Sequence, residues 1–595
     1  MTGGHSESSW EGAAPSARDV IWLVPELQMR PLAARRCVVR NPSNGVMREL
    51  SAGEYAALSA CEGLGTLAEH TARAVKQLGA PSEHRPAIRE FIERCARCGL
   101  LVSLPDLVAR FGDTASEPLA PLAGIVLRTA DRPQQLRRLF AEALELQTKT
   151  GNAYRWHVFD DSRHAESRRA NREAMAAHNA VASTHHDLSL EASLEAMLCA
   201  TAPDLAEEIH WVLGPARGNE LTYGRVDNYA VLRFAGQRVI LIDDDVGLFA
   251  RRPPLWKAGV EVTCQAEAEF RYQTLEDAWQ ACPPLDLDPF AAHARWLGLP
   301  LAEAWAQAER EEGGLHVLDL TGDTVQCFAD DARVLFTRSQ LVGDPGVDGL
   351  ATEHLVPTAE TRRWLVANPD AARNAFDSPI YARSGPALRL TPNRMQTVNM
   401  LVGLDNSRML PPTIRAGRGQ DVLFSEVSRS VYPAGWAVKL PFALPHLRSK
   451  PRRQLRPEDP IVLGPERLLW DRAHTCAASV VAQRPADRMA LLGALYVDLA
   501  AAGDAELTET LIGQAAEYVS RIVFGIHEQL DDPSLPSAWK DTLRRWHDST
   551  NFRLDTASLR ARITPLDETR AMANAYGRAL IAWPRLWQLC RERFQ

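Results

Sequence analysis

The sequence has no hydrophobic run long enough to cross a membrane. Its most apolar helical stretch, residues 489–502, is shorter than the roughly 18 residues that a membrane span requires and is interrupted by Asp498. Residues 1–19 are polar and lack the apolar core of a secretory signal, so we expect them to form a disordered tail. These absences predict a cytoplasmic protein without a transmembrane segment.

Several catalytic motifs and the charge of a nucleic-acid-binding protein are also missing. The chain contains no Gly-Lys-Ser/Thr phosphate loop, no Gly-x-Ser-x-Gly elbow and no His-Glu-x-x-His helix. Its net charge of −8 makes non-specific binding of nucleic acid unfavourable. The ten cysteines are dispersed. The one close pair, Cys95 and Cys98, has no second pair, which favours reduced thiols over a zinc site.

What the chain does contain is typical of a multidomain globular protein. Hydrophobic residues make up 46% of its 595 residues and charged residues 24%. At about 150 residues per domain, this length predicts three to four domains. The patterns described below divide the chain into a tail (1–19), a small α+β domain (20–110), an α/β domain (120–455) and a helical domain (456–595).

An acidic cluster ends one apolar run. Residues 239–242 are all Val, Ile or Leu, and Asp243, Asp244 and Asp245 follow directly. In an extended chain alternate side chains share a face, so we expect Asp243 and Asp245 to point one way and Asp244 the other. Two carboxylates on one face suit Mg²⁺ or Mn²⁺ bound together with a phosphorylated substrate. The alternative is a solvated turn at the end of a strand.

Two strand-turn-helix units precede this cluster. Residues 123–129 form a strand pattern, followed by a turn at Asp131 and a helical pattern over 134–144. A strand at 154–159 ends in Asp160, Asp161 and Ser162 before a charged helix. Open α/β sheets bind ligands beyond the carboxyl ends of their strands, where these polar groups stand. Alternatively, Asp160 and its neighbours only cap the following helix.

This order of motifs resembles the nucleotide-sugar glycosyltransferases of the family 2 type, which have a GT-A fold. The resemblance covers roughly residues 120–450 and includes Gly224, Arg225 and Asn228 at the start of a helix before the acidic strand. It implies a Rossmann-like mixed-sheet catalytic domain that binds a nucleotide-sugar donor, with a UDP-sugar expected first. It further implies that Asp243 and Asp245 hold Mn²⁺ or Mg²⁺, and that the donor contacts Thr129, Arg132, Asp160, Asp161, Arg225, Asn228 and Asp244.

A loop rich in glycine and arginine comes before Gln420 and Asp421, where the family commonly has Glu-Asp. The resemblance implies that Asp421 accepts the proton of the acceptor in an inverting mechanism. Because Asp421 begins a helix, we expect it to stay anionic. Arg415 and Arg418 are expected to face the diphosphate. The alternative is a carboxylate at a helix start and two solvated arginines, without a catalytic role.

His446 follows the last expected strand of the catalytic domain, where many GT-A enzymes supply a histidine to the metal. A basic run comes next, consisting of Arg448, Lys450, Arg452 and Arg453. It is expected either to cover the donor phosphates or to be a solvated linker.

The N-terminal domain has its own pattern. A strand at 36–40 and an Asn-Gly turn predict a hairpin, and Ser51 and Thr66 begin two helices with capping-box spacing. A third helix over 88–98 ends at Gly99. The order resembles the winged-helix peptide-recognition element of ribosomally made peptide pathways, which binds a leader peptide as an added strand. The alternative is a docking or oligomerisation domain.

The last segment is expected to be helical, and Pro584 to kink its final helix. Trp583 and Trp587 lie on one face of that helix. Such a pair forms either a platform for a sugar ring or, more commonly, part of the hydrophobic core. The whole pattern predicts a metal-dependent glycosyltransferase whose acceptor is a ribosomally made peptide. Two alternatives stay open: an acceptor that is a polysaccharide, lipopolysaccharide or small metabolite, and a non-catalytic peptide-binding scaffold, which Gln420 would favour.

Overall fold

The computed structural model describes residues 20–33, 35–111, 118–189, 192–218, 220–344, 355–373, 378–392, 400–448, 456–477, 480 and 482–595. The expected tail over 1–19 and the basic residues Lys450, Arg452 and Arg453 lie outside these ranges. Two compact units make up the chain. The first comprises Met1–Ala115, Val262–Cys264 and Val317–Ala332, and the second Ser116–Glu261, Gln265–His316 and Arg333–Gln595.

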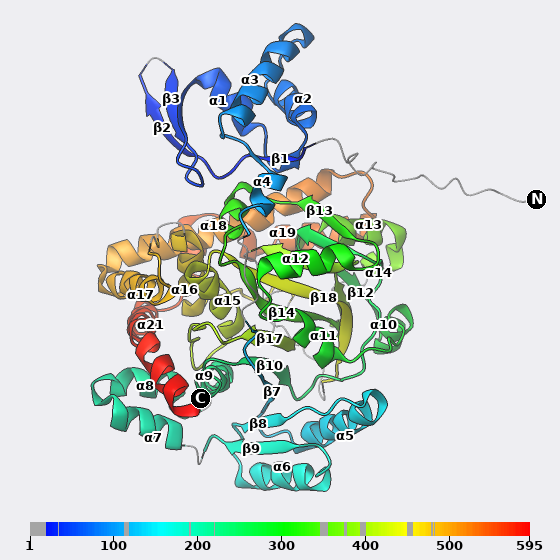
Figure 1. Cartoon of the computed structure of the whole chain (residues 1–595), viewed down its shortest axis with the longest axis vertical. Coiled ribbons are helices and arrows are strands. Elements are labelled where there is room, and N and C mark those ends of the chain that lie inside the picture. Colours follow the sequence, from blue (N-terminus) through cyan, green and yellow to red (C-terminus); the bar gives the residue numbers. More distant parts are fainter. Residues whose placement is uncertain are drawn as a thin grey trace, which may run out of the picture. The chain divides into compact units, whose positions relative to one another are not determined.

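The described residues of the first unit include two small antiparallel sheets and the helices α1 to α4 (Figure 1). The sheets have the orders β2-β3-β4 and β5-β1-β6. Their strands are β1 (Trp22–Leu23), β2 (Gln28–Leu32), β3 (Arg36–Arg40), β4 (Met47–Ser51), β5 (Leu64–Gly65) and β6 (Val102–Ser103). The helices are α1 (Ala52–Ser59), α2 (Leu67–Gln77), α3 (Arg85–Arg97) and α4 (Leu104–Val108).

Local sequence signals account for most of this unit. Ser51 and Thr66 form the predicted capping boxes with Glu54 and Glu69. Gly99 follows α3 with a φ of 82°, a conformation that glycine adopts without strain. The predicted hairpin is β3–β4, and the sequence did not indicate β2, which adds a third strand. All five residues of β2 are exposed, as suits a strand at the edge of its sheet.

The second unit is built on a mixed sheet, which confirms the predicted α/β class. Its order is β16-β18-β14-β17-β10-β7-β8-β9, with β15 beside β14 and β12 beside β15. The strands are β7 (Leu122–Thr129), β8 (Trp156–Asp160), β9 (Ser183–Asp187), β10 (Arg238–Asp243), β12 (Ala268–Arg271), β14 (Arg333–Gly343), β15 (Tyr381–Ser384), β16 (Leu388–Pro392), β17 (Leu401–Asp405) and β18 (Gly435–His446). β11 (Val260–Thr263) and β13 (Leu315–Asp319) each include residues of both units.

Four neighbouring strands of this sheet are parallel, and their register aligns the polar ends. In β10, β7, β8 and β9, Asp243 pairs with Arg128, and Thr129 pairs with Asp160. Because parallel strands end at the same edge of a sheet, side chains from distant segments meet there. Figure 1 shows α5 and α6 beside β8 and β9.

Helices surround this sheet and form the C-terminal part of the second unit. Those before α16 are α5 (Pro133–Thr150), α6 (Ala165–Ala177), α7 (Ala192–Thr201), α8 (Ala206–Leu213), α9 (Tyr223–Arg233), α10 (Leu275–Ala281), α11 (Pro289–Trp296), α12 (Leu301–Arg310), α13 (Ala359–Ala367), α14 (Pro369–Arg373) and α15 (Gln420–Val431). The rest are α16 (Pro465–Cys476), α17 (Pro485–Ala501), α18 (Asp504–Asp531), α19 (Ser537–His547), α20 (Thr556–Arg560) and α21 (Leu566–Phe594).

The predicted C-terminal helices are confirmed, and they belong to the same compact unit as the sheet. Trp583 and Trp587 are buried, and their ring nitrogens donate to Leu410 O and Asn406 Oδ1 at 2.7 and 3.1 Å. The tryptophan pair is therefore core, not a sugar platform. Pro584 lies inside the continuous helix α21. Within the described ranges, every helix is too short or too polar to cross a bilayer.

Candidate active site

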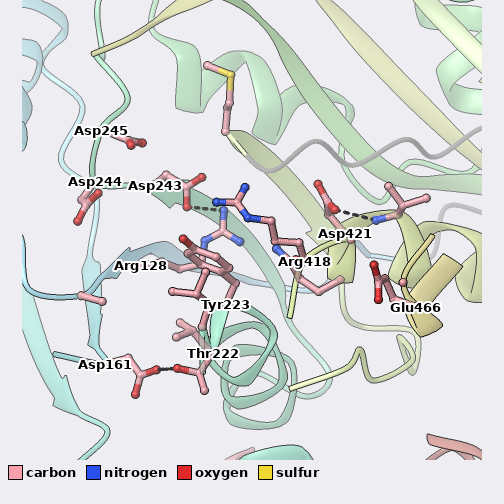
Figure 2. A pocket seen from close by; sticks show the side chains of 18 of the residues that line it. Arg128, Asp161, Thr222, Tyr223, Asp243, Asp244, Asp245, Arg418, Asp421 and Glu466 are labelled. Atoms are coloured by element: carbon pink, nitrogen blue, oxygen red, sulfur yellow. Dashed lines mark hydrogen bonds and ion pairs between the residues drawn. The ribbon is translucent and has the colours of Figure 1, made fainter. Parts of the chain in front are cut away.

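A cavity of about 910 Å³ opens at the carboxyl ends of β7, β8 and β10. The starts of α15 and α16 form its other side, as Figure 2 shows in part. Nine of the residues singled out from the sequence line this cavity: Thr129, Arg132, Asp161, Asp243, Asp244, Asp245, Arg418, Asp421 and His446. Arg448 lines it as well. The fold thus gathers predicted site residues from segments far apart in the chain.

The acidic cluster does not alternate as the sequence predicted. β10 ends at Asp243, and Asp244 and Asp245 lie in the turn that follows. Arg132 Nη1 donates to Asp244 Oδ1 at 3.1 Å and to Asp245 Oδ2 at 3.0 Å, so it holds these two side chains together. The prediction that Asp245 pairs with Asp243 while Asp244 faces away is therefore wrong, because the chain is no longer extended after Asp243. Thr129 Oγ1 also donates to Asp244, at 2.8 Å.

Asp243 instead forms an ion pair with Arg128, a residue that sequence analysis missed. Arg128 Nη2 lies 2.8 Å from Asp243 Oδ1, and its Nη1 lies 2.7 Å from Asp227 Oδ1 on α9. Burial opposes the charge on Arg128, but Asp243 and Asp227 outweigh it and raise its pKa. The only sign in the sequence was an arginine within an otherwise apolar strand.

Carboxyl groups outnumber guanidinium groups in this cluster. The carboxyl groups are those of Asp227, Asp243, Asp244 and Asp245, and they face the guanidinium groups of Arg128 and Arg132, while Arg448 also acts on Asp245. Burial raises the pKa of Asp243, and raises the pKa of Asp244 to about 6. An added cation would stabilise the ionised form of these carboxyl groups, since a bound dication is commonly the largest local charge in such a site.

His446 is placed to share a cation with Asp245. β18 ends at His446, and the N–H of Leu447 donates to Asp245 O at 2.7 Å, which fixes the two segments together. His446 Nε2 then lies 3.4 Å from Asp245 Oδ1. Burial favours neutral His446 and lowers its pKa, which suits a metal ligand.

These residues fit a small dication that takes its other ligands from substrate and water. Among the described residues, no group of three or more His, Cys, Asp or Glu side chains is arranged to hold a metal. Mg²⁺ is usually held by one or two carboxylates together with substrate phosphates. The surplus of carboxyl groups and the pairing of Asp245 with His446 therefore suit Mg²⁺ or Mn²⁺ that completes its coordination with substrate and water. They do not suit a site in which the protein supplies every ligand.

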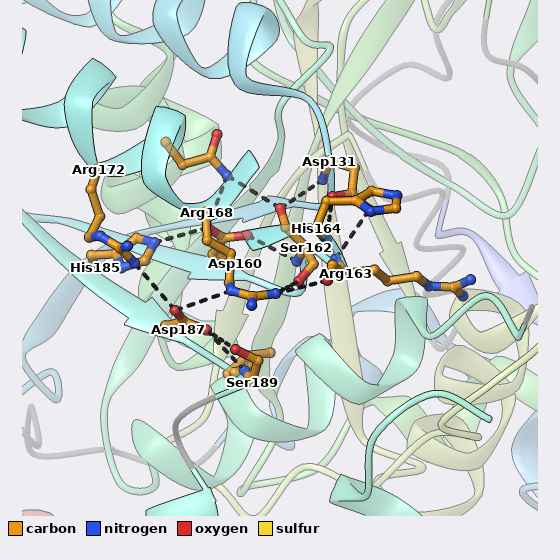
Figure 3. Close-up of polar contacts among 12 residues, drawn as sticks. Asp131, Asp160, Ser162, Arg163, His164, Arg168, Arg172, His185, Asp187 and Ser189 are labelled. Atoms are coloured by element: carbon orange, nitrogen blue, oxygen red, sulfur yellow. Dashed lines mark hydrogen bonds and ion pairs between the residues drawn. The ribbon is translucent and has the colours of Figure 1, made fainter. Parts of the chain in front are cut away.

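Asp161 and Asp160 have different surroundings although they are adjacent. Asp161 lines the cavity and accepts hydrogen bonds from Thr222 and Arg225, while burial raises its pKa. Asp160 is fully buried and accepts from Asn171 Nδ2 at 2.9 Å, and it contacts His185 (Figure 3). The backbone N–H of Ser162 also bonds to Asp160, at 3.0 Å. Asp160 does not line the cavity and its oxygens bond within the protein, so its expected contact with the donor stays a prediction without support from this geometry.

Three other residues expected to contact the donor do not line the cavity, because their side chains hold loops beside it. Arg225 donates to Leu213 O at 2.7 Å and Leu188 O at 2.9 Å. Asn228 bonds the backbone of Thr413 through both ends of its amide, at 2.8 and 2.9 Å. Arg415 binds Gly214 O and Glu220, at 3.2 and 2.9 Å. These residues shape the site without facing it.

Asp421 lies in the first turn of α15, after Gly419. Its Oδ1 accepts from the N–H of Val422 at 2.9 Å. Burial raises the pKa of Asp421 to about 6. The expected effect of the helix start is thus outweighed by desolvation, although the group is still mostly ionised at pH 7. Arg418 also lines the cavity, and its guanidinium carbon lies 5.9 Å from the ring centroid of Tyr223.

The C-terminal helices contribute a wall that sequence analysis did not assign to the site. Glu466 and Trp470 of α16 and Tyr518 of α18 line the cavity. In the sequence these residues belong to amphipathic helical patterns, in a region expected to form a separate domain. No local motif therefore indicated that they line the site.

No protein-family model, curated protein or solved structure matches this chain. The chemistry of the site itself is therefore the basis for assigning a function.

Proposed function

We propose that this protein is a divalent-cation-dependent glycosyltransferase that moves a sugar from a nucleoside-diphosphate donor to an acceptor. The observation that carries the proposal is the meeting of two groups in one cavity. One is the acidic cluster at Asp243–Asp245 with His446, and the other is the carboxylate of Asp421. The first suits a cation and a diphosphate, and the second suits a general base.

The donor diphosphate would lie against the acidic turn. Asp245 and His446, with Asp243 if it exchanges from Arg128, would hold Mn²⁺ or Mg²⁺ between the protein and the phosphates. A dication there stabilises the negative charge that develops on the departing diphosphate. Arg132, Arg418 and Arg448 supply further positive charge within the cavity. Asp161, at the end of β8, is available to the ribose or base of the donor, for which a UDP-sugar is the first choice.

Asp421 would act on the acceptor. As the acceptor oxygen bonds to the anomeric carbon, its proton passes to Asp421, and the bond from that carbon to the diphosphate breaks with its electron pair. The nucleoside diphosphate leaves with that electron pair. A base with a pKa of about 6 is ionised at neutral pH and still accepts a proton readily.

We further propose that the acceptor is a ribosomally made peptide and that the first unit, as a winged-helix-like module, recognises it. The sheet β2-β3-β4 supports this, because β2 and β4 are its outer strands and β2 is exposed along its whole length. An exposed edge strand can pair with an extended peptide through backbone hydrogen bonds.

Calorimetric titration with UDP-, GDP- and dTDP-sugars tests the reaction class. Each donor is added with Mn²⁺, with Mg²⁺ and with a chelator. We expect one donor to bind with metal and to lose affinity at least tenfold with chelator. Binding of no donor in the panel, or binding unaffected by chelator, would contradict the proposal.

A further inference from the structure

The cavity has an apolar wall opposite the acidic turn. It is formed by the segment over residues 460–464, by Trp470 of α16 and by Tyr518 of α18. Val462 lines the cavity with 57% of its surface exposed, so an apolar side chain is accessible there to a ligand. This wall belongs to the same compact unit as the acidic turn.

The segment over 460–464 is held by backbone hydrogen bonds, and Leu463 forms a β-bridge with Ile563. The N–H of Ile461 donates to Asn551 Oδ1 at 3.1 Å, and the N–H of Leu463 donates to Arg562 O at 2.9 Å. Both bonds reach the C-terminal helical region. The side chain of Val462 is therefore presented by a backbone that is anchored on both sides of it.

The aromatic part of the wall is rigid as well. The guanidinium carbon of Arg467 lies 4.9 Å from the ring centroid of Trp470 and 4.5 Å from that of Tyr518. Arg467 Nε also donates to Asp471 Oδ2 at 3.0 Å. A cation held between two rings restrains both of them.

Glu466 stands where this wall meets Asp421. A Cβ atom added to Gly419, which precedes α15, would lie 3.3 Å from Glu466 Cγ. A Cβ added to Gly464 would lie 2.1 and 2.3 Å from the two carboxylate oxygens of Glu466. Two glycines thus leave room for this side chain, which Figure 2 shows beside Asp421.

The carboxylate of Glu466 forms no ion pair with any arginine, lysine or histidine of the described ranges. Burial raises its pKa, and a hydrogen bond from its own backbone N–H offsets this only in part. A partly buried carboxyl group without a counter-ion is costly for the folded protein. Such a group inside a cavity is available to a ligand that donates a hydrogen bond.

We propose that this half of the cavity is the acceptor site, and that Glu466 orients the acceptor hydroxyl while the wall around Val462 binds its apolar body. The inference rests on the proposed function and adds the class of acceptor, a hydroxyl group carried on an apolar body. In a peptide this is a serine, threonine or tyrosine with apolar neighbours. Glu466 accepts a hydrogen bond from the hydroxyl as the acceptor binds and is a positioning residue. For transfer, the single O–H turns from Glu466 to Asp421, which takes the proton.

Glu466→Gln is the first test, with Glu458→Gln as a matched control. Glu458 is exposed, lies eight positions earlier and does not line the cavity. The readouts are donor affinity and the release of nucleoside diphosphate, with water or 1-butanol as acceptor. For Glu466→Gln we expect donor affinity within twofold of wild type and turnover at least tenfold lower, with a changed pH profile. Turnover and pH profile equal to those of the control would overturn the proposal.

A series of alcohols tests the apolar wall. The acceptors are methanol, ethanol, 1-propanol and 1-butanol, and the readout is the second-order rate constant for transfer. In the wild type we expect a rise of up to about fourfold for each buried methylene group. In Val462→Ser we expect a weaker dependence on chain length. A flat series in the wild type, or an unchanged slope in the variant, would overturn the assignment of this wall.

These outcomes separate the inference from the proposed function. If the wild type binds no donor, the proposed function fails and the inference fails with it. If the wild type binds and hydrolyses a donor but Glu466→Gln behaves as the control does, only the inference fails. Loss of donor binding in Glu466→Gln would also contradict the inference, because it would place Glu466 at the donor.

Discussion

Arg128 and Asp243 are register partners on neighbouring parallel strands, and their side chains form an ion pair of 2.8 Å. Asp227 completes the arrangement from α9, at 2.7 Å. A buried guanidinium between two carboxylates ties the sheet to a helix directly beneath the acidic turn. The same pair restrains Asp243, which must leave Arg128 if it is to bind a metal.

Replacing Arg128 with Met should destabilise the fold strongly. The change leaves Asp227 and Asp243 buried without their counter-charge, and breaking a buried pair in this way costs about 3–5 kcal/mol. Urea unfolding measures the free energy. Arg169→Met is the control, since Arg169 pairs with Glu173 on the exposed face of α6 and should cost less than about 1 kcal/mol. Equal losses in both variants would contradict the structural role of Arg128.

Replacing Asp245 with Asn should remove metal-dependent donor binding and leave the fold intact. Loss of a carboxylate ligand weakens the cation site by at least the roughly 100-fold seen when supporting residues are removed. Calorimetry with donor and Mn²⁺ measures this effect. Asp286→Asn is the control, because Asp286 is exposed and pairs with Lys149. Wild-type affinity in Asp245→Asn would remove Asp245 from the metal site.

Turnover should fall as the pH drops below about 6. Burial raises the pKa of Asp421 from 3.8 to about 6, so the basic form is lost as pH falls through that value. We expect a loss of about tenfold per pH unit on this limb of the profile. A profile of nucleotide release between pH 4.5 and 8 measures it. An acidic limb that persists unchanged in Asp421→Asn would contradict the assignment of the base.

The same pKa predicts that Asp421 lowers stability at neutral pH. A carboxyl whose pKa is raised on folding binds its proton more tightly in the folded state. Its favourable contribution is therefore complete below pH 3.8 and is lost as pH rises through about 6. Asp421→Asn should then raise the free energy of unfolding at pH 7 by on the order of 1 kcal/mol while it abolishes turnover. A variant less stable than the wild type at pH 7 would contradict this prediction.

Gly419→Ala should disturb the site more than Gly417→Ala does. Both glycines have positive φ, 82° and 101°, so both substitutions strain the backbone by about 1 kcal/mol. Only at Gly419 would the new Cβ approach Trp470, at 2.6 Å from Cζ3, whereas at Gly417 the nearest atom is 3.9 Å away. We expect a change in tryptophan fluorescence and at least a tenfold loss of turnover in Gly419→Ala alone. Equal activities would show that Trp470 adapts freely.

Local signals in the sequence predicted elements of the fold well. The strand at β7, the helices α5 and α6, and the capping boxes at Ser51 and Thr66 depend on residues within a few positions of one another. The acidic turn after β10 was likewise visible, because a run of apolar residues followed by carboxylates is a local pattern.

Local patterns gave no guide where a side chain's role depends on a distant partner. Asp160, Asn228 and Arg415 occur at positions expected to touch the donor, and their polar atoms bind other parts of the protein. Asp421 was expected to stay anionic because of its helix position, but burial in the folded chain raises its pKa to about 6. Spacing along a sequence carries no information about such neighbours.

By itself, then, the sequence determined the α/β class, several local elements such as β7, α5 and α6, and the presence of carboxylates at a strand end. The tertiary structure alone decided that Arg128 holds Asp243, that Asp244 and Asp245 share Arg132, and that Glu466 stands near Asp421. The physical reason is that secondary structure follows from short-range periodicity and capping. Burial, ion pairing and the walls of a cavity instead arise only when segments hundreds of residues apart are packed together.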